Sequence, residues 1–185
     1  MDQKQRCSWC NPSNPLYVQY HDEEWGVANF DDAYLYEMLI LESFQAGLSW
    51  ECVLNKRAHF RQAYRNFLLE KVASFDEETM AQLQQDPRII RNRLKIRASV
   101  TNSRIFQGIV SEYGSFYAYL CTFTQGRRFR ETGRTTSPLS DAISRDLQAR
   151  GMKFMGSVIV YAYLQAIGII DAHEEGCFLH VPGDM

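Results

Sequence analysis

Apolar residues recur at every third or fourth position along most of this chain, which is the spacing of helices that bury one face. The stripe is clearest in residues 31–47, where Asp31 or Asp32 can cap a helix. The buried face of this helix would carry five residues: Leu35, Met38, Leu39, Glu42 and Ala46. No stretch shows the sustained alternation of apolar and polar residues that is typical of strands, so the pattern predicts an all-α bundle.

Capping residues and glycines mark the ends of the other expected helices. Ser49 can begin a helix at Trp50, and Ser74 with Glu77 has the spacing of a capping box that begins a helix ending near residue 85. Three more helices are expected. One covers residues 93–113 and ends at Gly114, and another covers residues 156–167 and ends at Gly168. Between them, Ser137 and Pro138 begin a helix that Gly151 ends. Residues 122–136 contain four arginines and two glycines, and we interpret them as a mobile basic loop.

Composition places the chain among globular proteins with a single domain, residues 1–185. Hydrophobic residues make up 45% and charged residues 23%, which excludes an intrinsically disordered chain. The longest apolar stretch, residues 156–170, is too short and too often interrupted to span a membrane. Because the N-terminus lacks the apolar core of an export signal and the five cysteines are an odd number, we expect a cytoplasmic protein with reduced thiols.

Charge is distributed unevenly along the chain. Residues 86–153 carry 13 Lys and Arg against 5 Asp and Glu, whereas the segments on both sides are net acidic. Part of this charge lies in residues 86–97, between two expected helices, at Arg88, Arg91, Arg93, Lys95 and Arg97. A helix, a tight turn and a second helix can bind a phosphate of nucleic acid, although a solvated helix face or an ordinary surface loop would have the same composition.

Metal-ligating residue types stand at both ends of the chain. Cys7 and His21 lie near the start, and His173 and Cys177 are separated by three residues near the end. Together they would make a tetrahedral zinc site in which every position is filled by protein, so its role would be structural. Unrelated buried thiols and surface imidazoles are the alternative, and Cys10 and His180 are further candidate ligands.

Glu42 is unexpected on the apolar stripe, because burying an unpaired carboxylate is costly. Its head group could reach water at the helix end, which is the common case. The other possibility is a pocket in which one carboxylate and several aromatic faces bind a flat, cationic ring. Six aromatic residues in the first 50 positions could supply these faces, or could form core: Trp9, Tyr17, Tyr20, Trp25, Phe44 and Trp50.

Several sequence blocks together resemble one known family. The most specific are Tyr20-His21-Asp22-x-Glu24-Trp25-Gly26-Val27 and Gln45-Ala46-Gly47-Leu48-Ser49-Trp50. The other matching blocks are Arg6-Cys7-x-Trp9, Pro15-Leu16-Tyr17, Leu41-Glu42, Ile89-Ile90-Arg91 with Lys95-Ile96, Arg150-Gly151-x-Lys153-Phe154-x-Gly156, and Asp171-x-His173 with Gly176-Cys177. With these blocks, collinear from Cys7 to Cys177, the chain resembles the bacterial 3-methyladenine DNA glycosylase I family.

The resemblance implies an all-α helix-hairpin-helix DNA glycosylase that removes 3-methyladenine from alkylated double-stranded DNA. It also implies one structural zinc ion joining the N- and C-terminal segments, with the ligands Cys7, His21, His173 and Cys177. The base pocket would contain Trp9, Tyr20, Glu42 and Trp50, and the DNA-binding hairpin would lie in residues 89–96, where we expect Arg91, Arg93 and Lys95 to bind DNA. Two positions depart from the family pattern, since Ser43 replaces an expected glycine and Cys10 has no zinc role.

The implied chemistry follows from the positive charge of N3-methylated adenine, whose glycosidic bond is already weakened. The enzyme would flip the nucleotide out of the helix, bind the base and let water attack the sugar. We assign Glu42 first to recognition of the base and second to stabilising an oxocarbenium-like state, and Trp9 to stacking. No lysine stands out as a nucleophile, so we expect a monofunctional enzyme that does not cleave the strand. We also expect a monomer without a protein partner. The alternatives are a zinc-containing DNA-binding module without catalysis and a hydrolase with an open zinc site.

Overall fold

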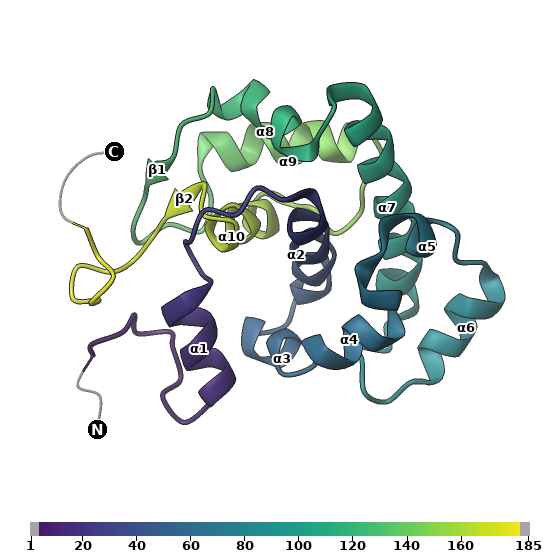
Figure 1. Cartoon of the computed structure of the whole chain (residues 1–185), viewed down its shortest axis with the longest axis horizontal. Coiled ribbons are helices and arrows are strands. Elements are labelled where there is room, and N and C mark those ends of the chain that lie inside the picture. The colour runs from purple at the N-terminus through teal and green to yellow at the C-terminus, as the bar shows by residue number, and fades with distance from the viewer. Residues whose placement is uncertain (1–3, 182–185) are drawn as a thin grey trace.

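The computed structural model describes residues 4–181, and nearly all of its regular structure is helical (Figure 1). The helices are α1 (Pro15–Glu23), α2 (Asp32–Gln45), α3 (Trp50–Leu54), α4 (Arg57–Ala63), the 3-10 turn η1 (Arg65–Phe67), α5 (Leu69–Ala73), α6 (Glu77–Gln85), α7 (Arg93–Tyr113), α8 (Phe116–Thr124), α9 (Pro138–Ala149) and α10 (Ser157–Ala166). Two short strands, β1 (Phe129–Arg130) and β2 (Ile170–Asp171), pair in parallel. None of these helices has both the length and the apolar character needed to cross a membrane.

Helix α2 lies in the middle of the molecule, between α10 and α7 (Figure 1). Of the five residues expected on its buried face, Leu35, Met38, Leu39 and Glu42 are buried. Ala46 is half-buried and follows the end of the helix. Because the helix has neighbours on several sides, its buried surface is wider than one stripe and also includes Ile40 and Leu41. The central position of α2 places Glu42 inside the protein rather than at its surface.

Most of the expected helix ends are confirmed. Asp31 caps α2 and accepts hydrogen bonds from the amides of Ala33 and Tyr34. The long helix α7 spans Arg93–Tyr113 and ends at Gly114, which has φ +86°. Ser137 begins α9 with a capping box. At the end of α10, Gly168 has φ +75° and packs so closely on residues 27 and 28 that a Cβ would lie 2.5 Å from a backbone nitrogen.

Three local expectations were wrong. Ser74 ends α5 instead of beginning α6, because its hydroxyl donates to the carbonyl of Lys71 while Asp76 caps α6. Ser49 does begin a helix, α3, but this helix ends at Leu54. A separate helix, α4, follows it, so the single helix expected after Ser49 is divided into two. The pair β1–β2 is a small departure from an all-α fold. The sequence did not predict it, because a two-residue strand is too short to show alternation of apolar and polar residues.

The arginines of the segment expected to be a mobile basic loop are partly turned inward. Arg128 donates to the carbonyls of Gly168 and Gly26 at 2.7 and 3.0 Å. Arg130 lies 3.6 Å from the Asp171 carboxylate, and the segment also contains the end of α8 and all of β1. This part of the chain is therefore tied to the C-terminal segment rather than free.

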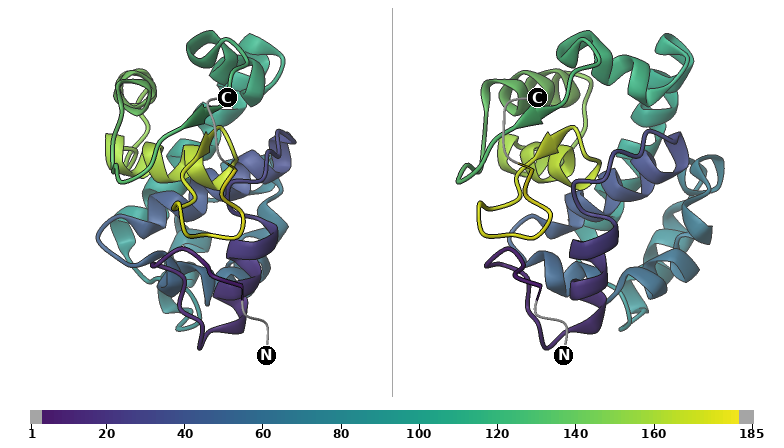
Figure 2. Two further views of the ribbon diagram at one scale, coloured as in Figure 1. Left: turned by 90° about the vertical axis from the view of Figure 1, so that its left-hand side faces the viewer. Right: turned by 60° about the vertical axis from the view of Figure 1, so that its left-hand side comes forward.

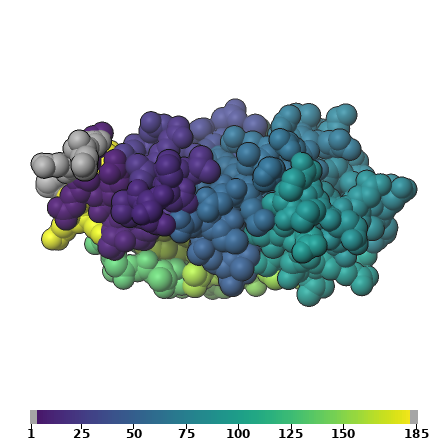
Figure 3. Space-filling model, turned by 90° about the horizontal axis from the view of Figure 1, so that it is seen from below, coloured from purple at the N-terminus to yellow at the C-terminus, as the bar shows by residue number. Residues whose placement is uncertain are grey.

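The N- and C-terminal segments lie side by side, as the two views in Figure 2 show. The amide of Phe178 donates to the carbonyl of Gln5 at 2.8 Å. Seen from below, the molecule runs from this N-terminal end through α3 and α4 to α6 and α7 at the other end (Figure 3). The functional site lies near the end where the two terminal segments meet.

Candidate active site

A cavity of about 390 Å³ opens between α1, α2, α3, α10 and the terminal segments. All four residues expected at a base pocket line it: Trp9, Tyr20, Glu42 and Trp50. The other lining residues are Tyr17, Trp25, Gln45, Gly133, Arg134, Thr135, Ala162, Gln165, Ala172 and Glu174. The structure therefore brings together residues that are up to 165 positions apart in the sequence.

Glu42 provides the acidic group of this cavity on its α2 side. Its side chain is only 2% exposed, and its Oε2 atom has no hydrogen-bond partner among the described residues. Burial raises the pKa of this carboxyl well above its usual value. Ionising this carboxyl is therefore costly unless a cation or a hydrogen-bond donor enters the cavity.

Two further buried polar atoms in the cavity lack a partner within residues 4–181. They are Nε1 of Trp50, a donor, and Oε1 of Gln45, an acceptor. An unsatisfied buried polar atom costs about 1–3 kcal/mol, so three in one cavity indicate a site for a polar ligand. Gln45 was not expected from the sequence, although it follows Glu42 by three residues and therefore shares its helix face.

Aromatic rings supply much of the remaining wall. The rings of Tyr20 and Trp50 have centroids 5.3 Å apart at an interplanar angle of 44°. Trp9 packs at 4.8 Å edge-on to Trp25 and at 5.2 Å from Tyr17. Such walls present ring faces to a flat ligand and attract positive charge.

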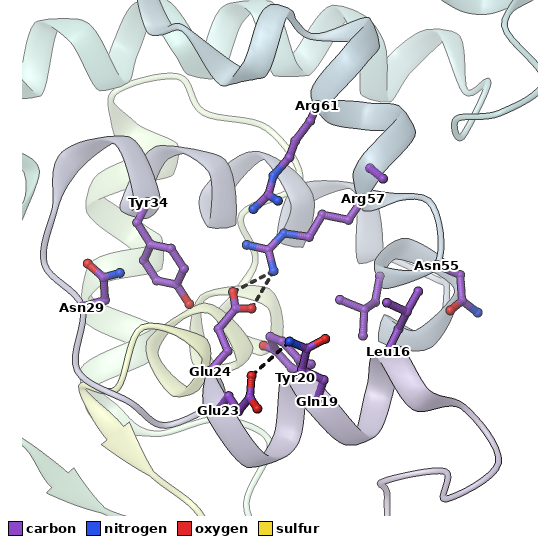
Figure 4. Close-up of a pocket in the computed structure, with 12 residues that line it drawn as sticks. Leu16, Gln19, Tyr20, Glu23, Glu24, Asn29, Tyr34, Asn55, Arg57 and Arg61 are labelled. Atoms are coloured by element: carbon purple, nitrogen blue, oxygen red, sulfur yellow. Dashed lines mark hydrogen bonds and ion pairs between the residues drawn. The ribbon is translucent and has the colours of Figure 1, made fainter.

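A charged network supports Tyr20 from its other side (Figure 4). There a second cavity, of about 520 Å³, is lined by Tyr20, Glu24, Tyr34, Arg57 and other residues. Arg57 donates to both carboxylate oxygens of Glu24, at 2.7 and 2.8 Å, and to Glu37 at 2.7 Å. These bonds join the end of α1 to α2 and α4, so Arg57 holds the helix that carries Tyr20.

Three of the four expected metal ligands form one cluster. The donor atoms of Cys7, His21 and Cys177 all lie within 4.8 Å of one another, and all three residues are buried. His173 lies beside them, with its ring centroid 5.6 Å from that of His21 and its buried Nε2 atom without a partner among the described residues. Cys10 is not a member, because its thiol points to the carbonyl of Tyr17.

Both histidines are oriented by carboxylates, an arrangement common around metal ligands. His21 Nδ1 lies 2.8 Å from Asp22, which also pairs with Arg6, and His173 Nδ1 lies 2.7 Å from Asp171. In each ring this leaves Nε2 as the ligand atom. Burial raises the pKa of the Cys7 thiol to about 12, an unfavourable place for a thiolate unless a cation compensates it. Two sulfurs and two such nitrogens fit the donor set of a structural zinc ion.

Comparison with known proteins decides the family. A sequence model of the methyladenine glycosylase family matches residues 9–180. The chain belongs to this family. Among its relatives, DNA-3-methyladenine glycosylase 1 of Escherichia coli strain K12 is 40% identical over 97% of this chain and 98% of its own length. The Haemophilus influenzae DNA-3-methyladenine glycosylase is 32% identical over 93% of this chain and 96% of its own.

Solved structures of the family share the same fold. A crystal structure of 3-methyladenine DNA glycosylase I has a TM-score of 0.90, at 38% identity, over 96% of this chain and all of the other. The enzyme from Staphylococcus aureus, solved to explain its recognition of 3-methyladenine, has a TM-score of 0.88 at 32% identity, over 94% of this chain and 95% of that one. The match extends over nearly the whole helical bundle of this methyladenine glycosylase.

The residues expected to bind DNA do not all lie at the surface of this methyladenine glycosylase. Arg91 lies in the turn between α6 and α7, and Arg93 is the first residue of α7. Both are exposed, and the described residues offer neither an ion pair nor a hydrogen bond to their side chains. Lys95 is only 6% exposed, and its ammonium group donates to the carbonyls of Phe44 and Ala46 at the end of α2. The structure thus corrects the expectation for Lys95, whose charge satisfies a helix C-terminus instead of facing solvent.

Proposed function

We propose that this protein hydrolyses the N-glycosidic bond of 3-methyladenine in alkylated double-stranded DNA, without cleaving the strand. The observation that carries the proposal is the aromatic cavity in which Glu42, Gln45 and Trp50 each hold a buried polar atom without a partner within the described chain. Support also comes from the relatives, which are named DNA-3-methyladenine glycosylase.

The unpaired atoms are complementary to an adenine ring. Its exocyclic amino group has two N–H donors, which the acceptor oxygens of Glu42 and Gln45 can bind, and the indole N–H of Trp50 can donate to a ring nitrogen. The aromatic walls favour a cationic base over neutral adenine. Selectivity for the methylated base then comes from charge as well as shape.

Glu42 can serve both binding and bond cleavage. When a cationic base enters, its charge favours ionisation of Glu42, and the carboxylate then stabilises positive charge as it moves from the base to the sugar. The methylated base leaves as a neutral molecule and needs no proton. For water to attack the sugar, the nucleotide must first rotate out of the duplex into the cavity.

No described lysine lines the cavity as a nucleophile for a Schiff base. Lys95, the buried lysine of α7, holds backbone carbonyls instead. This supports a monofunctional reaction, in which water rather than an amine attacks the sugar.

The metal cluster is assigned to structure. We infer that Cys7, His21, His173 and Cys177 hold one zinc ion, whose coordination would be filled by protein, so that it organises the two terminal segments without activating water. Asp22 and Asp171 would orient the imidazoles of His21 and His173 toward this ion.

DNA would approach the cavity from the side of the α6–α7 turn. Arg91 and Arg93 are exposed there and can bind phosphates on either side of the flipped nucleotide, as in a helix-hairpin-helix unit. We also expect a cytoplasmic protein that acts as a monomer.

The test is incubation of the purified protein with methylated duplex DNA and identification of the released bases. We expect the protein to release 3-methyladenine and to leave the DNA strands intact. We expect the Glu42→Gln variant to lose this base release. Tight DNA binding without any released base would instead make this a DNA-binding module. Base release that requires a metal with a bound water would indicate the open-site hydrolase.

A further inference from the structure

A second carboxylate lines the cavity, and it comes from the C-terminal segment rather than from α2. Glu174 follows β2 in the C-terminal segment and is half-buried. Its Oε2 atom accepts from the backbone amide of Ser8, and its Oε1 atom accepts from the Ser8 hydroxyl, both at 2.7 Å. Two short hydrogen bonds from one residue hold the carboxylate in a fixed orientation across the two terminal segments.

The charge of Glu174 is not compensated by an ion pair. Within residues 4–181, both hydrogen bonds to its carboxylate come from neutral donors of Ser8, and none of the ion pairs between described residues includes Glu174. Arg57, by contrast, neutralises Glu24 behind Tyr20. An uncompensated carboxylate on a cavity wall attracts a cation and does not attract a neutral ligand of the same shape.

The negative charge of Glu174 adds to what Glu42, the other carboxyl group of the cavity, provides. Burial raises the pKa of Glu42 well above the usual value, so ionising this carboxyl is costly while the cavity contains no cation. Arg134, on the loop after β1, is exposed and lines the same cavity. Among the described residues that line the cavity, Glu42 and Glu174 carry the carboxyl groups, and Glu174 is the less buried of the two.

We propose that Glu174 is a specificity-determining residue, whose charge makes the site prefer cationic alkylated purines over neutral bases of the same shape. The inference rests on the proposed glycosylase function and adds to it the basis of selection by charge. It does not require Glu174 to touch the sugar or to take part in bond cleavage.

A structural role is the competing explanation, because the Ser8–Glu174 link lies next to Trp9, a wall of the cavity. Glu174→Gln separates the two roles. The amide of glutamine can accept from the Ser8 N–H and donate to the Ser8 hydroxyl, so the link is kept while the charge is lost. Ser8→Ala does the reverse, since it removes one of the two hydrogen bonds and keeps the charge. Glu175→Gln, one residue along and exposed, is the matched control for net charge.

The experiment compares a cationic with a neutral lesion. One duplex carries 3-methyladenine and is scored by kcat/KM for base release. The other carries 3-deaza-3-methyladenine, a neutral isostere, and is scored by Kd. For Glu174→Gln we expect kcat/KM on the cationic lesion to fall about threefold to tenfold, with Kd for the neutral duplex within about twofold of wild type. Ser8→Ala and Glu175→Gln should keep the wild-type ratio of the two values, and metal content should be equal in all variants.

Three results would overturn the inference. Equal losses on both duplexes would make Glu174 a structural support of Trp9. An effect no larger than that of Glu175→Gln would show that its charge does not act at the site. If the wild-type protein released no 3-methyladenine at all, the proposed function would fail first and this inference with it.

Discussion

Replacing Glu42 by glutamine should make the protein more stable and less active at the same time. The carboxyl is buried, and burial raises its pKa well above the usual value. In the unfolded chain the same group titrates near its ordinary pKa of about 4.3. Between these two pKa values the folded protein holds a proton that the unfolded chain has lost, and its stability falls as the pH rises through this window.

The size of the effect follows from linkage. Between the unfolded and the folded pKa, one extra bound proton changes the free energy of unfolding by about 1.4 kcal/mol per pH unit. The wild type should lose stability relative to Glu42→Gln at this rate, starting above the pKa of the unfolded carboxyl. All other titrating groups are common to both proteins, so they cancel in the difference.

Urea denaturation at pH 5, 6 and 7 measures this difference directly, and base release at pH 7 measures activity. We expect the stability of Glu42→Gln relative to wild type to increase steadily with pH, and kcat/KM for 3-methyladenine to fall at least about tenfold, the scale of a lost charge-assisted contact. A pH-independent difference would mean that Glu42 is ionised and compensated in the folded protein. A variant with undiminished base release would remove Glu42 from the reaction.

Three other predictions can be checked on the same material. Arg91→Ala and Arg93→Ala should each weaken DNA binding and lower its salt dependence by about one unit of slope without changing Tm. Lys95→Met should leave this slope unchanged. It should lower the free energy of unfolding in urea by about 1–3 kcal/mol, because it leaves the last carbonyls of α2 without a donor. Arg57→Met should destabilise the protein by about 2 kcal/mol by the same measurement, since it removes the partner of Glu24 and leaves Glu37 paired with Arg61 alone. Cys177→Ser should lower both the zinc content measured by atomic absorption and Tm, and some base release should remain at low temperature.

The helices and the acidic pocket residue could be predicted from local pattern. Asp31 caps α2, Gly114 ends α7, and Glu42 stands out because it interrupts an apolar stripe. Each of these signals depends on residues within one or two helical turns. They hold in the structure because tertiary packing agrees with them.

Lys95 could not be predicted in the same way. In the sequence it is one of several basic residues around a turn, which resembles a surface that binds phosphate. Its actual partners, the carbonyls of Phe44 and Ala46, precede it by about 50 residues and meet it only because α7 packs against the end of α2. The inward-facing Arg128 and the charges around Arg57 were missed for the same reason, since their partners are far away in the sequence.

The metal cluster and the cavity are built from the same short segments. Trp9 follows Cys7 by two residues, Tyr20 directly precedes His21, and Glu174 directly follows His173. Residues 4–14 contain no helix, and ordering each residue of such a segment costs about 1–2 kcal/mol in backbone entropy. The free energy of binding one ion to ligands from three segments would offset this entropy cost. A structural zinc ion would therefore stabilise one wall of the cavity directly, and losing it should weaken base binding before it unfolds the helices.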